Sequence, residues 1–161
     1  MIGYLPENAP LYPDLSVQSQ LKMIAELRCV PIKTQSQLIS DSVAKTGISA
    51  QLTRPIRELS KGYRQRVGIA QSILHLPRVL ILDEPTAALS PLYQQQIIDR
   101  IDALRAKGIT VLIVEQNARL SLSRSDRGYI FSNGKVVHTD AASRILVDPQ
   151  INEYFLGTKK E

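Results

Sequence analysis

Two short, unbroken apolar runs limit what this chain can fold into more than any other feature. Val79–Leu82 has the length of a strand, and Ile109–Val114 contains a second such run, Val111–Val114. Between them, Ser90-Pro91 is a strong start for a helix that Gly108 ends. Strands that are apolar throughout and are joined by a helix are typical of a parallel sheet covered on both faces. We therefore predict an α/β fold with a parallel sheet.

The rest of the sequence adds further helices and a hairpin. Ile2–Pro6 could be the end of another strand, and a helix should follow the glycine at position 62. Ser132-Asn133-Gly134 is a hairpin turn signal. Three other helices are expected: one capped by Ser16 and ending near Cys29, one that starts at Thr34 and ends at Gly47, and one capped by Thr139 that reaches Val147.

Composition restricts the class of protein. A length of 161 residues suits one domain, and 43% hydrophobic with 22% charged residues is ordinary for a soluble globular protein. No apolar run approaches a membrane span, and the N-terminus does not resemble a signal peptide. A lone cysteine, Cys29, fits a reducing cytosol. The net charge of +5 comes from scattered Lys and Arg, so no nucleic-acid partner is expected.

Two adjacent carboxylates, Asp83 and Glu84, follow the first apolar strand and precede Pro85. Such a pair at the end of a buried strand is costly unless positive charge compensates it. A phosphate-bound Mg²⁺ would supply that charge, with one carboxylate holding the ion and the other polarising an attacking water. A solvent-facing acidic pair is the alternative, and the glycine-containing segment upstream favours the phosphate chemistry.

That upstream segment is Ser60-Lys61-Gly62, at the start of the third predicted helix. The unpaired backbone N–H groups and the dipole of a helix N-terminus attract anions, and a glycine lets phosphate approach the backbone. Ser60 could also act only as an ordinary helix cap. Its position shortly before Asp83-Glu84 favours phosphate binding.

From Ile2 to Gly157 the sequence resembles the later two-thirds of the nucleotide-binding domain of ATP-binding cassette (ABC) transporters. Leu59-Ser60-Lys61-Gly62-Tyr63-Arg64-Gln65-Arg66 resembles the family's signature loop, and Val79–Pro85 resembles its Walker B strand. With the opening Ile2–Tyr12, the first half is similar to ATPases of ABC-2 type exporters, including gliding-motility ones. Val114–Arg119 and Asp126–Tyr129 resemble ATPases of branched-chain amino acid importers.

The resemblance implies a fold, ligands and roles. The fold would be a partial RecA-like P-loop NTPase sheet with a helical subdomain, about residues 16–76, inside one partial domain of residues 1–161, whose Walker B and switch part covers about 77–161. ATP and Mg²⁺ would be the cofactors. Asp83 would hold Mg²⁺ through water, Glu84 would be the catalytic base, and Gln116 would occupy the switch position. The nucleotide would also meet Glu7, at the Q-loop position, and the signature residues Ser60, Lys61 and Gly62.

The family's phosphate loop, G-x-x-x-x-G-K-[ST], is absent from the 161 residues. Gly134-Lys135 is the only Gly-Lys pair, and it belongs to the predicted hairpin. We therefore expect a chain that is N-terminally incomplete and lacks the Walker A strand and loop. Negligible ATP affinity and turnover are expected for the chain alone. In this family the missing strand lies inside the sheet, so unpaired edges and an exposed apolar face should remain.

Three functions are compatible with these patterns. The first is an ATPase subunit of an ABC transporter, which would pair with a second nucleotide-binding domain and with a permease at the cytoplasmic face of the membrane. The second is a non-catalytic partner of a complete nucleotide-binding domain or of a permease. Chromosome maintenance ranks last, because that function needs long coiled coils and the sequence has no sustained heptad pattern.

Overall fold

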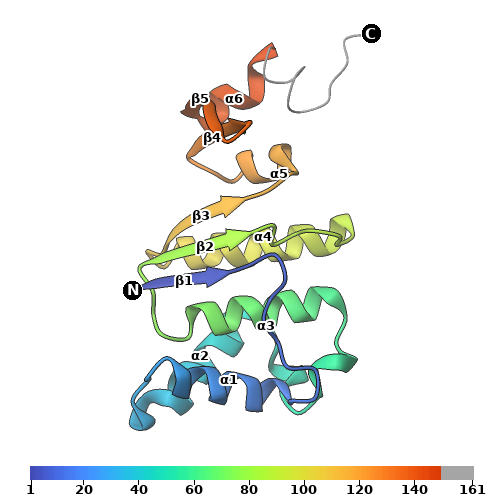
Figure 1. Cartoon of the computed structure of the whole chain (residues 1–161), viewed down its shortest axis with the longest axis vertical. Helices are drawn as coiled ribbons and strands as arrows, with labels where there is room; N and C mark the ends of the chain where they lie inside the picture. Colours follow the sequence, from blue (N-terminus) through green and yellow to red (C-terminus); the bar gives the residue numbers. More distant parts are fainter. Residues whose placement is uncertain (150–161) are drawn as a thin grey trace. The chain divides into compact units, whose positions relative to one another are not determined.

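The computed structural model describes residues 1–149 and divides the chain into two compact units (Figure 1). The first unit is Met1–Val114, and the second begins at Glu115. The stretch from residue 150 to 161, which includes the end of the predicted Walker B and switch part, lies outside the described residues.

A three-stranded parallel sheet forms the centre of the first unit (Figure 1). Its strands are β1 (Ile2–Leu5), β2 (Val79–Asp83) and β3 (Thr110–Val114), in the order β1-β2-β3. Leu5 pairs with Leu82, and Asp83 pairs with Val114, so the carboxyl ends of all three strands meet at one edge. The predicted α/β fold with a parallel sheet is therefore confirmed.

Helices of the first unit cover only one face of this sheet, so the expectation of two covered faces is wrong for this unit. The chain adds its strands in sequence order, and right-handed crossovers in one direction place their helices on the same face. Helices α3 (Lys61–Ile73) and α4 (Pro91–Arg105) lie in these two crossovers. They bury the face that carries Leu5, Leu80 and Leu82.

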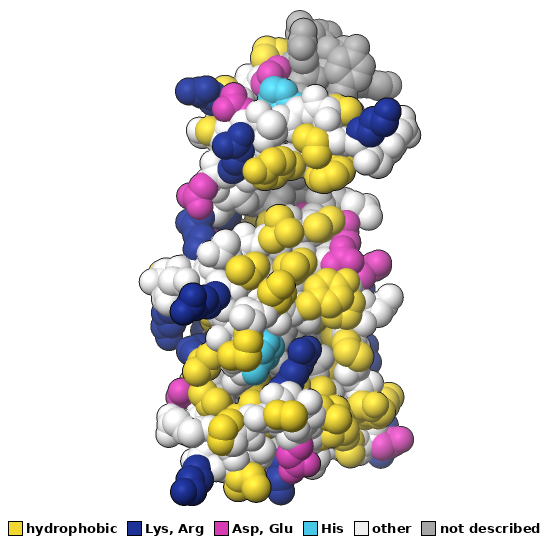
Figure 2. Space-filling model, turned by 60° about the vertical axis from the view of Figure 1, so that its left-hand side comes forward, with side chains coloured by type: hydrophobic (Ala, Val, Ile, Leu, Met, Phe, Trp, Pro, Cys, Tyr) yellow, Lys and Arg dark blue, Asp and Glu magenta, His cyan; other side chains and the backbone are white. Residues whose placement is uncertain are grey.

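The other face of the sheet is apolar and partly exposed. Ile2 is 57% exposed, Tyr4 49%, and Leu112 and Val114 50% each, and all four lie on this face by strand register. Figure 2 shows hydrophobic side chains gathered over this region of the first unit. Within the described residues, β1 and β3 each pair with β2 alone. The exposed apolar face and open strand edges agree with the expectation drawn from the family resemblance.

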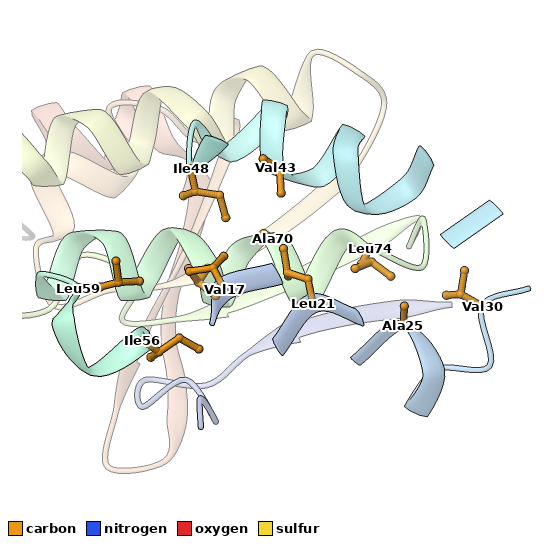
Figure 3. Close-up of a cluster of buried hydrophobic side chains, with 11 residues drawn as sticks. Val17, Leu21, Ala25, Val30, Val43, Ile48, Ile56, Leu59, Ala70 and Leu74 are labelled. Atoms are coloured by element: carbon orange, nitrogen blue, oxygen red, sulfur yellow. The ribbon is translucent and has the colours of Figure 1, made fainter. Parts of the chain in front are cut away.

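A helical layer packs against α3 on the side away from the sheet. It consists of α1 (Val17–Leu27), α2 (Ile32–Thr46) and the 3₁₀ turns η1 (Ser49–Gln51) and η2 (Ile56–Glu58). Figure 3 shows the apolar side chains that these elements bury together. The cluster consists of Val17, Leu21, Ala25, Val30, Val43, Ile48, Ile56, Leu59, Val67, Ala70 and Leu74.

The ends of α1 and α2 confirm some of the capping predictions and contradict one. Ser16 caps α1 by accepting a hydrogen bond from the Ser19 N–H at 3.1 Å, as predicted. The predicted start of α2 at Thr34 is wrong, because the helix begins at Ile32 and the Thr34 hydroxyl donates back to the Pro31 carbonyl at 3.0 Å. Gly47 ends α2 in the left-handed conformation, with φ of 67°. A residue with a Cβ would be strained there.

The second unit contains a hairpin between two short helices. Its elements are α5 (Ala118–Leu122), β4 (Arg127–Ser132), β5 (Lys135–Ala141) and α6 (Ala142–Val147). Asn133 and Gly134 both have positive φ, 50° and 74°, as a tight two-residue hairpin turn requires. The predicted cap at Thr139 is wrong: β5 runs through Thr139 to Ala141, and α6 begins at Ala142.

None of the helices among residues 1–149 is long and apolar enough to cross a bilayer. The predicted boundary between a helical subdomain and a Walker B part, near Leu76, remains a proposal. The α1–α3 layer and the sheet both belong to the first compact unit, and the division found in the structure follows Val114.

Candidate nucleotide site

The two carboxylates lie at the carboxyl end of the central strand of the first unit. Asp83 is the last residue of β2, and Glu84 follows it directly; both side chains are half-buried. Ligands of open parallel α/β sheets bind at this edge, beyond the carboxyl ends of the strands. The position is therefore suitable for the predicted Mg²⁺ and water chemistry.

The backbone at Glu84 is held in an uncommon conformation. Its φ is 48°, in the left-handed region that a residue with a Cβ adopts at a cost of about 1–2 kcal/mol. Its N–H donates to the Val114 carbonyl at 2.9 Å, and its carbonyl accepts from the Ala87 N–H at 3.0 Å. These two bonds fix the direction in which the strand leaves the sheet. Strain that the surrounding structure maintains in this way is common at functional sites.

The N-terminus of α3 carries the predicted signature residues. Ser60 is the N-cap, and its hydroxyl oxygen accepts from the Tyr63 N–H at 3.4 Å. The N–H groups of Lys61 and Gly62 precede the first bond within the helix. Ser60 and Lys61 are exposed, whereas Gly62 is buried. The end of this helix can therefore present backbone donors, a hydroxyl and a cation to an anion.

The loop that follows the carboxylates connects them to this helix. Gln65, one turn into α3, is buried and donates through Nε2 to the Pro85 carbonyl at 3.3 Å. A Cβ placed on Gly62 would lie 3.4 Å from Cδ1 of Tyr93 and 3.9 Å from Cδ2 of Leu89. The first two turns of α3 therefore contact the segment that follows the carboxylates, at Pro85 and at Leu89.

Glu7 lies in the loop that follows β1 and is exposed. Because β1 and β2 are parallel neighbours, this loop leaves the same edge of the sheet as Asp83. The loop packs tightly on α3: a Cβ on Gly68 would lie 2.6 Å from Leu5 Cδ1 and 2.9 Å from Ala9 Cβ. Glu7 thus belongs to the same edge as the carboxylates.

A buried glutamine ties this loop to both neighbouring helices. Gln20, on α1, is fully buried and donates to the Pro10 carbonyl at 3.3 Å and to Oε1 of Gln71 on α3 at 3.0 Å. It also accepts from the Tyr12 N–H at 3.2 Å. The sequence prediction did not include Gln20 or Gln71, and it named Gln65 only as part of the signature motif. A polar residue at a core-facing helix position was the only available signal.

Gln116 lies in the second unit, where it is exposed and its carbonyl accepts from the Ala118 N–H at 2.8 Å. Its role at the switch position remains a prediction. Asn117 beside it caps α5 by accepting from the Leu120 N–H at 3.3 Å.

The donor set suits a phosphate-bound magnesium ion. Within residues 1–149, no group of three or more His, Cys, Asp or Glu side chains could enclose a metal. Asp83 and Glu84 offer carboxylate oxygens only. Mg²⁺ in nucleotide sites commonly uses one or two carboxylates and takes its other ligands from phosphate and water. The pair therefore fits Mg²⁺ that arrives with a nucleotide.

A family model for ABC transporters matches residues 1–87, more than half of the chain. The chain belongs to the ABC transporter family. Its curated relatives include a high-affinity branched-chain amino acid transport ATP-binding protein, BraG, from Pseudomonas aeruginosa, which is 31% identical over 158 residues and 97% of this chain. The lipopolysaccharide export ATP-binding protein LptB of Haemophilus influenzae is 32% identical over 157 residues, again covering 97% of this chain.

Solved structures agree with the fold. The ADP conformation of the ATP-binding cassette MJ1267 aligns with a TM-score of 0.82 at 23% identity, over 98% of this chain and 68% of that one. The structure of cbiO1 from Clostridium perfringens, part of the ABC transporter complex cbiONQ, aligns with a TM-score of 0.83 at 25% identity, over 96% of this chain and 64% of that one. The architecture is that of an ABC ATP-binding cassette.

The chain spans somewhat less than two thirds of the curated relatives it matches, 66% of BraG and 65% of LptB. The activity, substrates and partners of those whole proteins can therefore be only proposals for this chain.

Proposed function

We propose that this chain is part of the ATP-binding, ATP-hydrolysing subunit of an ABC transporter, with ATP and Mg²⁺ as its cofactors. The observation that carries the proposal is a contact between the two segments for which phosphate chemistry is predicted. The N-terminus of α3 and the carboxylates of β2 are joined through Gln65, which bonds the loop after Glu84.

Each residue at the sheet edge has a distinct role in this proposal. Asp83 holds Mg²⁺ through water, and Glu84 polarises the water that attacks the γ-phosphate. Glu7, at the Q-loop position, senses the ion and its water. Gln116 belongs to the second unit, and its proposed role is that of the switch residue, a hydrogen-bond partner that carries no positive charge.

The signature residues act on a different nucleotide. Ser60, Lys61 and Gly62 contact the phosphates of an ATP held by the phosphate loop of a second nucleotide-binding domain. The exposed Ser60 and Lys61, and the N–H groups that precede the first bond of α3, support this role. The partners are thus a second nucleotide-binding domain and a permease. The permease would hold the subunit at the cytoplasmic face of the membrane.

The 161 residues contain no phosphate loop, so we expect negligible ATP binding and turnover from this polypeptide alone. The rate of Mg-ATP hydrolysis by the purified chain tests this expectation directly, in the wild type and in Glu84→Gln. Glu26→Gln is the matched control, because Glu26 is an exposed glutamate on α1. Robust turnover that Glu84→Gln abolishes and Glu26→Gln preserves would prove the expectation of inactivity wrong while supporting the role of Glu84.

A non-catalytic partner is the second candidate, favoured by an intact signature helix in a sequence without its own phosphate loop. Such a chain would pair with a complete nucleotide-binding domain and offer Gly62 to that domain's ATP. Size-exclusion chromatography of the mixture should show association only with ATP. Gly62→Leu should weaken the association, because the added side chain meets Tyr93, whereas Gly108→Asn, at a position with open space, should not. Absence of any ATP-dependent complex would rule out this candidate.

A further inference from the structure

A groove between α3 and α4 carries two arginines, Arg66 and Arg100, that form no ion pair with a carboxylate within residues 1–149. It has a volume of about 500 Å³, and Tyr63, Arg66, Tyr93, Gln96 and Arg100 are among its lining residues. Positions 93, 96 and 100 form one stripe along α4, and positions 63 and 66 face them from α3. The groove lies within the first unit and begins beside Gly62, whose nearest side chain is Tyr93.

Both guanidinium groups are held in place by neutral contacts. Arg66 lies over the Tyr63 ring, 5.3 Å from its centroid, and donates to Oε1 of Gln96. Arg100 lies against the C-terminal end of α2, with Nη2 2.9 Å from where a Cβ on Gly47 would be. Among residues 1–149 neither arginine forms an ion pair with a carboxylate. The one acidic lining residue, Asp99, already accepts from Gln95 at 2.7 Å.

We propose that this groove binds an acidic peptide segment of a protein partner, with its carboxylates on Arg66 and Arg100. Guanidinium groups match carboxylates in a two-bond geometry, and Tyr and Arg are the residues that protein interfaces favour. Tyr63 and Tyr93 lie in the first turns of α3 and α4, whereas Arg66, Gln96 and Arg100 lie beyond them, where backbone N–H groups bond within the helix. The part of the groove around the arginines therefore lacks the nest of N–H donors typical of phosphate sites. A carboxylate ligand therefore fits better than a phosphate.

The stripe of residues along α4 sets the length of the ligand. Gln96 and Arg100 are about one helical turn apart along α4, near 6 Å, and Tyr93 extends the stripe to about two turns. An extended peptide covers that length in about three to four residues. Two carboxylates two residues apart in such a peptide can reach both arginines.

Fluorescence anisotropy with a labelled peptide tests the proposal on the full chain. The probe is an eight-residue peptide of alternating glutamate and serine, with a glutamine–serine peptide of equal length as its control. Wild type should bind the glutamate peptide saturably and the glutamine peptide at least tenfold more weakly. Arg66→Gln and Arg100→Gln should each weaken binding at least fivefold, while Arg66→Lys and Arg100→Lys should retain part of it.

Arg64→Gln is the matched control, because Arg64 is an exposed arginine of α3 outside the groove and its loss changes the net charge equally. It should change the affinity less than twofold. Equal weakening by Arg64→Gln would show a general charge effect and overturn the proposal, as would the lack of saturable binding by wild type. Displacement of the peptide by inorganic triphosphate at a lower concentration than by free glutamate peptide would mark a phosphate site instead. Circular dichroism confirms that each variant is folded.

Discussion

Replacing Gln20 with leucine should destabilise the first unit by about 2–4 kcal/mol, because leucine cannot replace any of the three hydrogen bonds of this buried side chain. Each such bond contributes about 1 kcal/mol net to the free energy of unfolding. The Pro10 carbonyl and the Gln71 side-chain oxygen, left without a partner in the variant, lower stability further where water cannot reach them. Urea unfolding followed by circular dichroism measures the difference in the free energy of unfolding. Gln18→Leu is the matched control, since Gln18 is exposed on the same helix.

The Gln20–Gln71 bond can be isolated with a double-mutant cycle. Gln71→Leu alone should cost about 1–2 kcal/mol, and the double variant should cost about 1 kcal/mol less than the two single costs added together. The reason is that both single variants lose the same 3.0 Å bond. Strict additivity, or a Gln20→Leu cost no larger than that of Gln18→Leu, would refute the idea that this network ties the Glu7 loop to α3.

Three further changes test local features. Ser60→Ala should lower stability by about 1 kcal/mol in urea unfolding, because the Tyr63 N–H loses its cap, while Ser60→Gly should cost only a few tenths. Glu84→Gly should be more stable than Glu84→Ala by about 1 kcal/mol, since only glycine adopts φ of 48° without strain; equal stabilities would contradict this. The Ala141 N–H, which donates to the Asp140 carboxylate at 2.7 Å, is the main reason that the pKa of Asp140 lies below its ordinary 3.8; desolvation opposes this lowering, and Arg144 and His138 add to it. Its stabilising contribution should therefore be complete above that value and be lost as pH falls through the lower folded pKa, and NMR titration of the carboxyl should show a midpoint below 3.8.

Features encoded locally could be predicted from the sequence. The parallel strands follow from continuous apolar runs, and the caps at Ser16 and Ser60 follow from the side chain's ability to bond the next turn. The errors at Thr34 and Thr139 also have a local cause. Both residues have the chemistry of a cap, but Thr34 lies within the first turn of α2, and Thr139 pairs with Tyr129 in the hairpin.

Long-range contacts could not be predicted in the same way. Gln71, one of the partners of Gln20, is 51 residues away from it in the sequence, and Pro85, the partner of Gln65, is 20 residues away. No periodic pattern identifies such pairs. Coverage of one sheet face depends on strand order and crossover handedness rather than on the composition of any strand. For the candidate site, the carboxylates and the signature residues were predicted from their residue types, whereas the loop that joins them needed the structure.

The central claim is that the N-terminus of α3 faces a phosphate loop of another domain across ATP, and site-directed crosslinking tests it most directly. Lys61→Cys in a Cys29→Ser background would be mixed with a complete ABC ATP-binding subunit that carries one cysteine in its phosphate loop. A disulfide or short-linker crosslink should form with ATP and not without it, and Lys22→Cys on α1 should give no crosslink. Crosslinking that is independent of ATP, or equally efficient from position 22, would contradict the claim.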